Sequence, residues 1–509
     1  MTPARAFVLA TGLACVALVA AAYRSVLAMP HFAEWYIEHQ VACGQGFRPE
    51  ELWLRRGPYY RPAGYWTNQL VCALGGREPR PVRDHALWLG VHLACVGLVF
   101  AVLRERCGAA AAAAAALGFG LHPSLTPVVV YPVPWMALVG LLLLLAVAVY
   151  APIARSASPP AWTRSILGGS VVLLAALVCE PGVCAAAAVA GGLAIEGWRR
   201  RDARWAVRAV GPAALALVSY GVLRTVAMGP SFFDSYVGPP PTWRALVWVW
   251  ARNAVYEAAV WANPVRLPFA DRSADDRAIL AVYGAVFLGT LAGALAFGPI
   301  RRYLADHPLP VVGLAFYVLL QMNSNWLVVK EPIGRAGIDR SYLQYLPVLL
   351  LALLAGPGLG RAAAAAGPWA RAALMVAVTT WLAAAFVAQQ NALALAEEGG
   401  RILRADQTAL TPFLRTLPEG ATVVPCGFPE ALRAPHLPWA WIYFFSREAI
   451  FSEWAGRHIL VPRPLGDHPA PPGFDGYVVI RDHHGIRWFD GSAHGAFDVS
   501  GPCATWTRP

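Results

Sequence analysis

The sequence predicts an all-α polytopic membrane protein with a small α/β domain at its C-terminal end. The 509 residues are 57% hydrophobic and only 14% charged, whereas soluble domains contain about 25% charged residues. Apolar runs recur at the length of a membrane helix, which needs about 20 residues to cross a hydrocarbon core of about 30 Å. The tail from residue 389 onward lacks such runs and is much more polar.

About eleven apolar segments have the length of a membrane span. Unbroken runs such as 138–149 do not alternate as the strands of a membrane barrel do. The segment 241–262 is rich in Trp but is interrupted by Arg244, Arg252 and Glu257, so we expect an interfacial helix there. The expected spans are 6–28, 86–103, 107–121, 127–151, 165–179, 182–198, 205–228, 277–299, 309–329, 343–359 and 367–388.

The distribution of arginine predicts the orientation. The net charge is +11, and Lys330 is the single lysine. Basic residues gather in cytoplasmic loops, and here they occupy alternate loops, which predicts a cytoplasmic N-terminus. The first loop, 29–85, and the tail then lie in the periplasm; this loop has arginines too, but long loops count little. The arginines that set this pattern are Arg104, Arg106, Arg155, Arg164, Arg199, Arg200, Arg201, Arg204, Arg208, Arg301, Arg302 and Arg361.

The tail is expected to form a separate periplasmic α/β domain, 389–509, behind a transmembrane domain, 1–388. It opens with an expected helix over 391–417. The two runs that flank Asp482 to Gly485 suit a β-hairpin. The β-like runs are 421–424, 458–461, 477–481 and 486–489.

The nine cysteines include two pairs that share a predicted periplasmic region. Cys43 and Cys72 lie in the first loop, and Cys426 and Cys503 lie in the tail. Disulfides persist in oxidising compartments, so we predict one in each pair if both regions are periplasmic. No C-x-x-C spacing indicates zinc, and no metal site is predicted. No soluble basic face suggests nucleic acid as a partner.

The first loop carries residues that suit acid–base and phosphate chemistry. Glu34 and Glu38 would share one face of a helix just beyond the first span. A carboxylate partly buried under aromatic residues there can act as a general base; the alternative is a solvated loop start. Arg61 follows Tyr60 and suits bidentate contact with phosphate, or else anchors the loop at the interface.

Other polar residues lie within the predicted spans or at their ends. His85 and His92 share a helical face, where buried hydrogen bonding is favoured over metal binding because further ligands are lacking. His122 ends the third span and could equally be a helix stop. Glu180, at the junction of the fifth and sixth spans, is expected to face a cavity or an arginine because burial of its charge is costly.

The loop before the tenth span adds a further basic pair. Lys330 and Arg340 are candidates for holding a lipid phosphate, and Tyr342 follows closely. The alternative is that these cations pair with Glu331 and Asp339.

This ordered set resembles the GT-C superfamily of multi-spanning glycosyltransferases, and within it the bacterial relatives of the protein O-mannosyltransferase and TMTC-like branch. Those proteins have an acidic pair after the first span, a Tyr-Arg-Pro-Leu string, two histidines in the second span and Leu-His-Pro ending the third. A Lys-Glu precedes the sixth span, and Arg-Tyr-Leu-Tyr-Leu-Pro opens a late one. The matches, over about residues 1–390, are Glu34, Tyr60 to Pro62, His85, His92, Leu121 to Pro123, Glu180 and Arg340 to Pro347.

The chain also departs from the pattern of this superfamily. Glu34 follows Ala33, so one carboxylate replaces the usual pair. Trp88 stands in place of an Asn, Pro127 in place of a Glu and Cys179 in place of a Lys, while Ser341 is inserted after Arg340. These changes bear on activity, donor choice and metal dependence. An inactive member of the superfamily is therefore an alternative interpretation.

The resemblance implies a bacterial inner-membrane enzyme that transfers a hexosyl or pentosyl group from a polyprenyl-phosphate donor to a periplasmic protein, glycan or lipid. Glu34, with Glu38 in reserve, would act on the acceptor, and Arg61, Lys330 and Arg340 on the leaving phosphate. Donor, acceptor and membrane lipid are the expected partners; no cofactor is assigned, and a divalent metal and the oligomeric state stay open. The alternatives are a lipid-linked sugar flippase, for which Gln321 and Asn323 to Asn325 are the intramembrane polar residues, and a non-catalytic envelope scaffold. Tyr60, His85, His92, His122, Glu180 and Tyr342 would complete the substrate-binding set.

Overall fold

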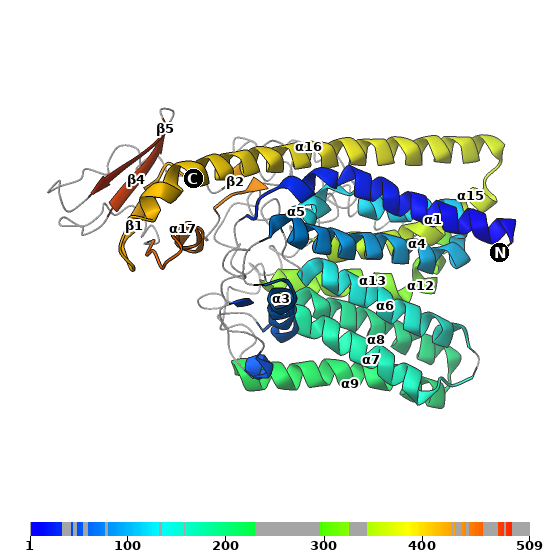
Figure 1. The fold of residues 1–509 in the computed structure, drawn as a ribbon. Coiled ribbons are helices and arrows are strands. Elements are labelled where there is room, and N and C mark those ends of the chain that lie inside the picture. Colours follow the sequence, from blue (N-terminus) through cyan, green and yellow to red (C-terminus); the bar gives the residue numbers. More distant parts are fainter. Residues whose placement is uncertain are drawn as a thin grey trace.

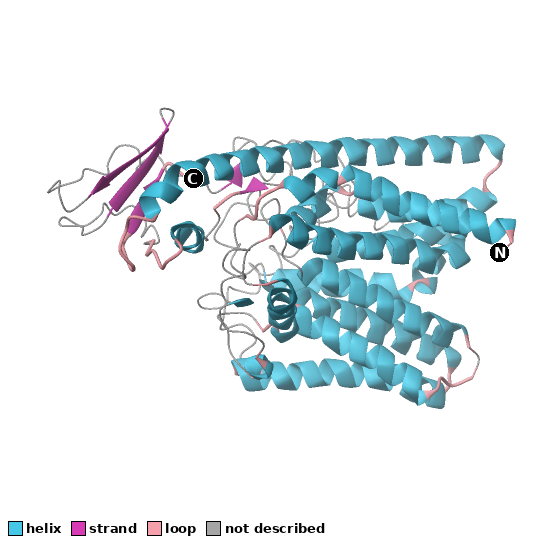
Figure 2. Ribbon diagram, viewed as in Figure 1, coloured by secondary structure: helices cyan, strands magenta, loops and turns pink. Residues whose placement is uncertain are grey.

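The computed structural model is a bundle of long helices with a small domain at one end (Figure 1). Helices make up most of the described chain, and strands occur only near its C-terminal end (Figure 2). The structure describes residues 2–32, 42–43, 48–53, 60–76, 80–131, 135–156, 158–229, 296, 298–324, 344–429, 431–432, 440–443, 447–461, 477–482 and 485–490.

Several successive helices of the bundle, such as α7, α8 and α9, are joined by short turns. Several of the helices begin with proline, among them those that start at Pro3, Pro62, Pro81 and Pro368, where the missing N–H leaves no intrahelical bond unmade. The elements are α1 (Pro3–Ala22), η1 (Arg24–Ala28), η2 (Pro49–Leu52), α3 (Pro62–Gly75), α4 (Pro81–Gly120), η3 (Pro123–Leu125), α5 (Thr126–Val130), α6 (Trp135–Arg155), α7 (Trp162–Val178), α8 (Glu180–Arg200), α9 (Ala203–Met228), α12 (Gly298–Asp306), α13 (Pro308–Ser324), α15 (Tyr345–Ala365) and α16 (Pro368–Leu414).

Seven of the described helices are long and apolar enough to cross a membrane: α1, α4, α6, α8, α9, α15 and α16. The helices α7 and α13 contain shorter apolar stretches. Apolar side chains cover the outside of the bundle; on α9, Leu215, Val218, Val222 and Val226 are all more than half exposed. This surface suits lipid rather than water, so the prediction of a multi-pass all-α membrane protein is confirmed. Eleven spans remain a prediction, because residues 230–295, with segment 241–262, lie outside the described chain.

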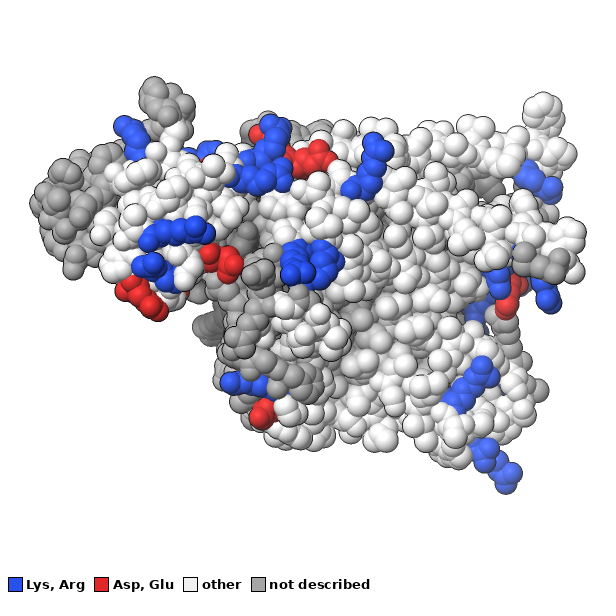
Figure 3. All heavy atoms as spheres, viewed as in Figure 1, with Lys and Arg blue, Asp and Glu red and all other residues white. Residues whose placement is uncertain are grey.

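The two ends of the bundle hold different parts of the chain. The proximal end holds the N-terminus, and the distal end holds α3, α5 and the small C-terminal domain (Figure 1). In Figure 3 the Lys, Arg, Asp and Glu side chains of the visible face gather toward these two ends, with a largely uncharged band between them. That distribution is expected of a protein whose middle zone lies in hydrocarbon.

Gly108 reverses the chain inside α4. Its φ of 80° and ψ of 165° interrupt the helix, and this backbone conformation is essentially restricted to glycine. The two arms of α4 pack back on one another, since His92 on the first arm contacts the Gly120 carbonyl near the end of the second. The predicted spans 86–103 and 107–121 are therefore the two arms of one helical hairpin.

The helix α16 joins the membrane bundle to the C-terminal domain without a break. Its 47 residues extend about 70 Å at 1.5 Å per residue, more than twice the hydrocarbon core. The Gln390 side chain donates to the Ala22 carbonyl at 2.9 Å, and Arg404 donates to the Ala28 carbonyl at 3.0 Å. These bonds satisfy carbonyls at the ends of α1 and η1.

The C-terminal domain is built around two small sheets. The strand β1 (Val423–Cys426) pairs in parallel with β4 (Tyr477–Asp482), which pairs antiparallel with β5 (Gly485–Asp490). The strands β2 (Ala431–Leu432) and β3 (Ala440–Trp441) form an antiparallel pair. The helix α17 (Arg447–Ala455) packs against α16 and supplies core aromatics.

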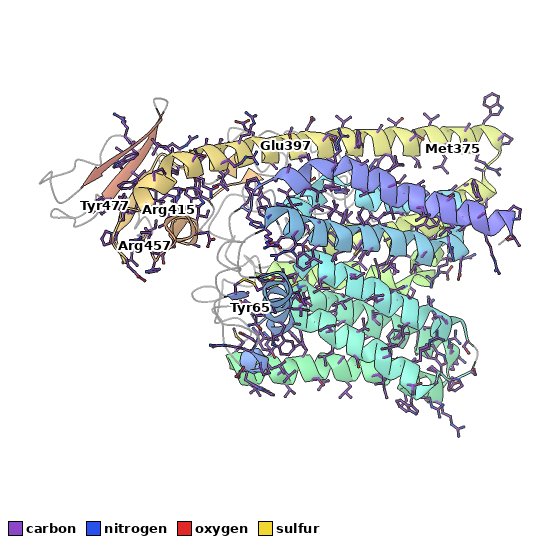
Figure 4. The ribbon with its side chains drawn as sticks, in the orientation of Figure 1. Tyr65, Met375, Glu397, Arg415, Arg457 and Tyr477 are labelled. Carbon is purple, nitrogen blue, oxygen red and sulfur yellow. A yellow bond between two sulfur atoms is a disulfide. The ribbon has the colours of Figure 1, made fainter. Side chains whose placement is uncertain are left out.

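Asp406 fastens this domain to α16. Its two carboxylate oxygens each accept one bond at 2.9 Å, from Tyr443 Oη and from Arg481 Nε on β4. Near the end of α16, Phe413 stacks on Trp488 of β5 with ring centroids 4.9 Å apart. Phe413 also packs edge-on against Tyr477 with ring centroids 5.7 Å apart; Figure 4 labels Tyr477 and, near the end of α16, Arg415.

Three boundaries differ from those expected from sequence. No helix end occurs at 388/389, because α16 continues from Pro368 to Leu414. The run 458–461 forms only an isolated bridge from Thr422 to Leu460. The expected span 127–151 is divided into α5 and α6, because the backbone leaves the helical region at Tyr131, which has φ −89° and ψ 112°, as is favoured for a residue that precedes a proline.

Gly108 offers a direct test of the hairpin. Replacing Gly108 with Ala is expected to destabilise the detergent-solubilised protein by about 1–3 kcal/mol, because a Cβ is strained at this φ and ψ. Gly90→Ala is the matched control: it lies in the same helix with no atom within 4 Å of the added Cβ, and it is expected to stabilise the protein by about 0.5–1 kcal/mol, because alanine is the better helix former. Denaturant unfolding curves measure both. Equal stability of the two variants would contradict the reversal at Gly108.

Candidate functional site

Part of the first loop is folded into a compact unit around α3. The structure joins Cys43 to Cys72 in a disulfide. Buried Gln69 donates to the carboxylate of buried Glu51 at 3.2 Å. Trp66 donates from its indole to the Arg48 carbonyl at 2.8 Å. These bonds tie the short helix η2 to α3 at the distal end.

Tyr60 and Arg61 lead directly into α3. Tyr60 is buried, and its hydroxyl donates to the Leu52 carbonyl at 3.0 Å. Burial raises the pKa of Tyr60 to about 12, so this phenol stays protonated at neutral pH. The guanidinium carbon of Arg61 lies 4.6 Å from the ring centroid of Trp135 at the start of α6, a geometry that suits a cation–π contact.

Gly64 allows α3 to pack closely on the bundle. A Cβ at this position would lie 2.7 Å from the Val178 carbonyl oxygen and 2.9 Å from the Trp135 indole nitrogen. The contact brings Arg61 to the junction of α7 and α8, where Glu180 is the first residue of α8. Arg61 and Glu180 are both at the distal end of the bundle, and their placement at the outer surface stays a prediction.

The two stems of the first loop meet at a buried carboxylate. His31 Nε2 lies 3.1 Å from one oxygen of Asp84, and Arg83 Nε lies 2.7 Å from the other. His31 and Asp84 are both at most 2% exposed. We name this group the stem cluster: His31, Arg83, Asp84 and His85.

His85 completes the stem cluster. Its side chain is fully buried, and Nε2 donates to the Pro30 carbonyl at 3.3 Å. Its ring centroid lies 5.9 Å from that of His31. Phe32, on the same stem, packs edge-on against Tyr131. The stem cluster thus holds residues 30–32, directly before the segment that carries Glu34.

His92 lies deeper in the bundle and joins helices. Both ring nitrogens are engaged, Nδ1 with Tyr345 Oη at 2.9 Å and Nε2 with the Gly120 carbonyl at 3.2 Å. Tyr23 packs edge-on against the same ring. Since His92 is 0% exposed, it lies apart from Arg61 and serves to connect α1, α4 and α15.

His122 is also buried and has a capping role. Its Nδ1 accepts a bond from the Ser124 backbone N–H at the start of η3, and its ring lies near Trp381 of α16. Of the predicted residues that the structure describes, Arg61 and His85 therefore lie in separate places at the distal end, whereas His92 lies deeper in the bundle.

The remaining predicted residues lie outside the described parts of the chain. These are Glu34, Glu38, Lys330, Arg340, Tyr342 and Cys503. Cys426 is the last residue of β1, but its side chain is not described. Among the described residues, no group of three or more His, Cys, Asp or Glu side chains is placed to hold a metal ion.

Sequence reasoning did not select three residues that organise the distal end: His31, Asp84 and Trp135. Asp84 precedes His85 and His31 opens the loop, so both were adjacent to selected positions. Their partnership spans the whole loop, however, and local patterns do not indicate it. Trp135 follows two prolines at the start of a span, which is a general interfacial signal.

The chain matches no protein-family model and no curated protein sequence. Solved structures do match. A structure of the Archaeoglobus fulgidus oligosaccharyltransferase in complex with zinc and sulfate has a TM-score of 0.50 and 12% sequence identity, over 92% of this chain and 68% of that chain. This likeness shows a shared fold, and it confirms the GT-C fold expected from the sequence resemblance.

Two further structures have lower TM-scores. ArnT from Cupriavidus metallidurans bound to undecaprenyl phosphate has a TM-score of 0.48 and 12% identity, over 92% of each chain. The Archaeoglobus fulgidus oligosaccharyltransferase AglB, in complex with an inhibitory peptide and a dolichol-phosphate, has a TM-score of 0.48 and 12% identity. That match covers 92% of this chain and 69% of that chain.

Removal of the buried carboxylate tests the stem cluster. Asp84→Ala is expected to cost about 3 kcal/mol, because buried His31 and half-buried Arg83 lose their shared partner. Asp84→Asn keeps an acceptor and should cost less. The control is Glu397→Ala, on the exposed surface of α16 (Figure 4). Denaturant unfolding gives the three values, and a loss in Asp84→Ala no larger than in the control would contradict the cluster.

Proposed function

We propose that this protein is a membrane glycosyltransferase that moves a sugar from a polyprenyl-phosphate donor to a periplasmic acceptor. The observation that carries the proposal is the GT-C fold, shared with an oligosaccharyltransferase over 92% of the chain. The resemblance of the sequence motifs to the O-mannosyltransferase and TMTC-like branch supports the same activity.

The distal end suits the chemistry. Arg61 sits at the entry to α3 with its guanidinium against Trp135, and the disulfide and the buried Glu51–Gln69 pair brace this helix. A guanidinium held in place before the reaction stabilises charge that develops on a leaving phosphate without costly reorganisation. The stem cluster anchors the loop start at His31, three positions before Glu34 in the sequence.

The proposed step is a displacement at the anomeric carbon. Glu34, with Glu38 in reserve, takes the proton of the acceptor hydroxyl. The acceptor oxygen bonds to the anomeric carbon while the bond from that carbon to the phosphate oxygen breaks. The polyprenyl phosphate leaves with the electron pair, and Arg61, together with Lys330 and Arg340, stabilises its negative charge. Tyr60, His85, His92, His122, Glu180 and Tyr342 support the substrate-binding end.

We also propose that the distal end faces the periplasm of a bacterial inner membrane and that the proximal end faces the cytoplasm. The arginine pattern supports this orientation. The disulfide in the first loop supports it independently, because disulfides persist in oxidising compartments and the cytoplasm keeps thiols reduced. The C-terminal domain would then stand in the periplasm beside the acceptor.

A transfer assay tests the activity. The purified protein, given a polyprenyl-phosphate-linked sugar, is expected to transfer the sugar to a periplasmic acceptor fraction. Glu34→Gln should lower the rate by about 100-fold or more, because the proton acceptor is lost. Arg61→Gln should lower it by about 100-fold, because a donor to the leaving group is lost. Arg415→Gln, an exposed change in the C-terminal domain, is the control and should match wild type.

The possible outcomes separate the candidate functions. Full activity of Glu34→Gln would overturn its assignment as the base and direct attention to Glu38. An absence of transfer by wild type, together with movement of the donor across liposomes, would favour a transporter over a transferase. An absence of both would favour the envelope scaffold.

The disulfide tests the orientation. In protein extracted with thiols blocked by alkylation, peptide mapping should recover Cys43 linked to Cys72, while Cys107 near the proximal end is alkylated. The Cys43→Ser variant should lose about 3–4 kcal/mol of stability by the loop-entropy relation. Recovery of both cysteines as free thiols from growing cells would contradict a periplasmic distal end.

A further inference from the structure

A second polar cluster lies at the proximal end, far from Arg61 and the stem cluster. Tyr303 on α12 forms its centre. The His307 ring packs on Tyr303 with centroids 4.4 Å apart, and the guanidinium carbon of Arg361 lies 5.1 Å from the Tyr303 ring centroid. The Tyr303 hydroxyl donates to the Leu354 carbonyl. This bond ties α12 to α15 and holds the cluster in place.

The turn of α4 contributes another cation. A Cβ at Gly360 of α15 would lie 2.7 Å from the Cβ of Cys107, so the two helices touch at this point. Arg106 precedes Cys107 and is exposed. Burial lowers the pKa of His307, and the charges of Arg361 and Arg106 lower it further, whereas the Tyr303 carbonyl and Asp306 raise it. His307 therefore lies within the field of two arginines.

Positive charge exceeds negative charge around this group. Asp306 is 3.4 Å from Arg361 and offsets it in part. Exposed Arg301 and Arg302 lie on α12 itself, and Arg104 lies two positions before Arg106. In the described segments 104–106, 301–307 and 361, five arginines stand against two acids, Glu105 and Asp306. The surplus attracts an anion.

The position of the cluster along the bundle indicates which anion. Trp369, just beyond the end of α15, is 89% exposed, and Trp198 near the end of α8 is 80% exposed. Exposed tryptophans mark the level of lipid headgroups in membrane proteins. A basic cluster between helix ends at that level meets phospholipid phosphates at high local concentration.

We propose that Arg106, Arg361 and His307 form a binding site for the phosphate of an anionic phospholipid. The arginine side chains donate charge-assisted hydrogen bonds to the phosphate oxygens, and the Tyr303 ring supports the Arg361 guanidinium from below. A zwitterionic headgroup carries its own cation and is disfavoured by the surplus of arginine. The site is independent of sugar transfer, since it lies at the opposite end of the molecule.

Lipid retention tests this site in the intact protein. Wild type is incorporated into nanodiscs of phosphatidylglycerol and phosphatidylcholine, extracted, and its retained lipids are counted by native mass spectrometry. We expect retention of phosphatidylglycerol, with about a fivefold loss of affinity for each arginine removed in Arg106→Gln and Arg361→Gln. Arg361→Lys should keep most of the binding, and Arg415→Gln, at the other end, all of it.

A spectroscopic measurement on wild type tests the same site and does not depend on how well the variants fold. With isotope-labelled histidine, the pKa of His307 in wild type should rise on addition of phosphatidylglycerol vesicles, because an adjacent anion favours the imidazolium. Phosphatidylcholine vesicles should leave it unchanged. A rise produced equally by inorganic phosphate alone would reassign the site to free phosphate. Equal retention of both lipids, or an unshifted His307, would overturn the proposal.

Discussion

The paired burial of Asp84 is the constraint on which the distal end depends. A carboxylate that is 1% exposed is tolerated only where cations and hydrogen bonds offset its loss of hydration. His31 and Arg83 supply them, and because His31 and Asp84 stand at opposite stems of the first loop, they close it. Next to this pair, a Cβ on Gly400 of α16 would lie 2.9 Å from the Pro30 ring. The first loop, α4 and the helix that bears the C-terminal domain therefore share one anchoring point.

The spans were predictable because a membrane leaves an apolar run of about 20 residues few alternatives to a helix. Where the boundaries were wrong, the local chemistry explains the error. The polar residues Gln389, Gln390 and Asn391 end the apolar run, but they can continue a helix, so α16 does not stop there. The short strands β2 and β3 depend on pairing with each other, and two residues carry too little pattern to be recognised.

The sequence pattern grouped several described residues by the end of the bundle on which they lie, but it did not predict their side-chain partners. Motif order placed Arg61, His85 and Glu180 toward one surface, and the elements that carry them do meet at the distal end. The alternative of buried hydrogen bonding, weighed for His85 and His92, matches their contacts. The pairing of His31 with Asp84 and the contact of Arg61 with Trp135 join residues distant in sequence. The local pattern of a single sequence carries no signal for such contacts.

Because α16 runs without a break from the bundle into the C-terminal domain, this one helix sets the position of the domain relative to the bundle. A helix advances about 100° and 1.5 Å for each residue, so the separation between Gln390, bonded to α1, and Asp406, bonded to β4, fixes the angle at which the domain is presented. Insertion of a single residue between them would turn the domain by about a quarter of a revolution. The number of residues between these two positions of α16 thus determines the orientation of the C-terminal domain relative to the bundle.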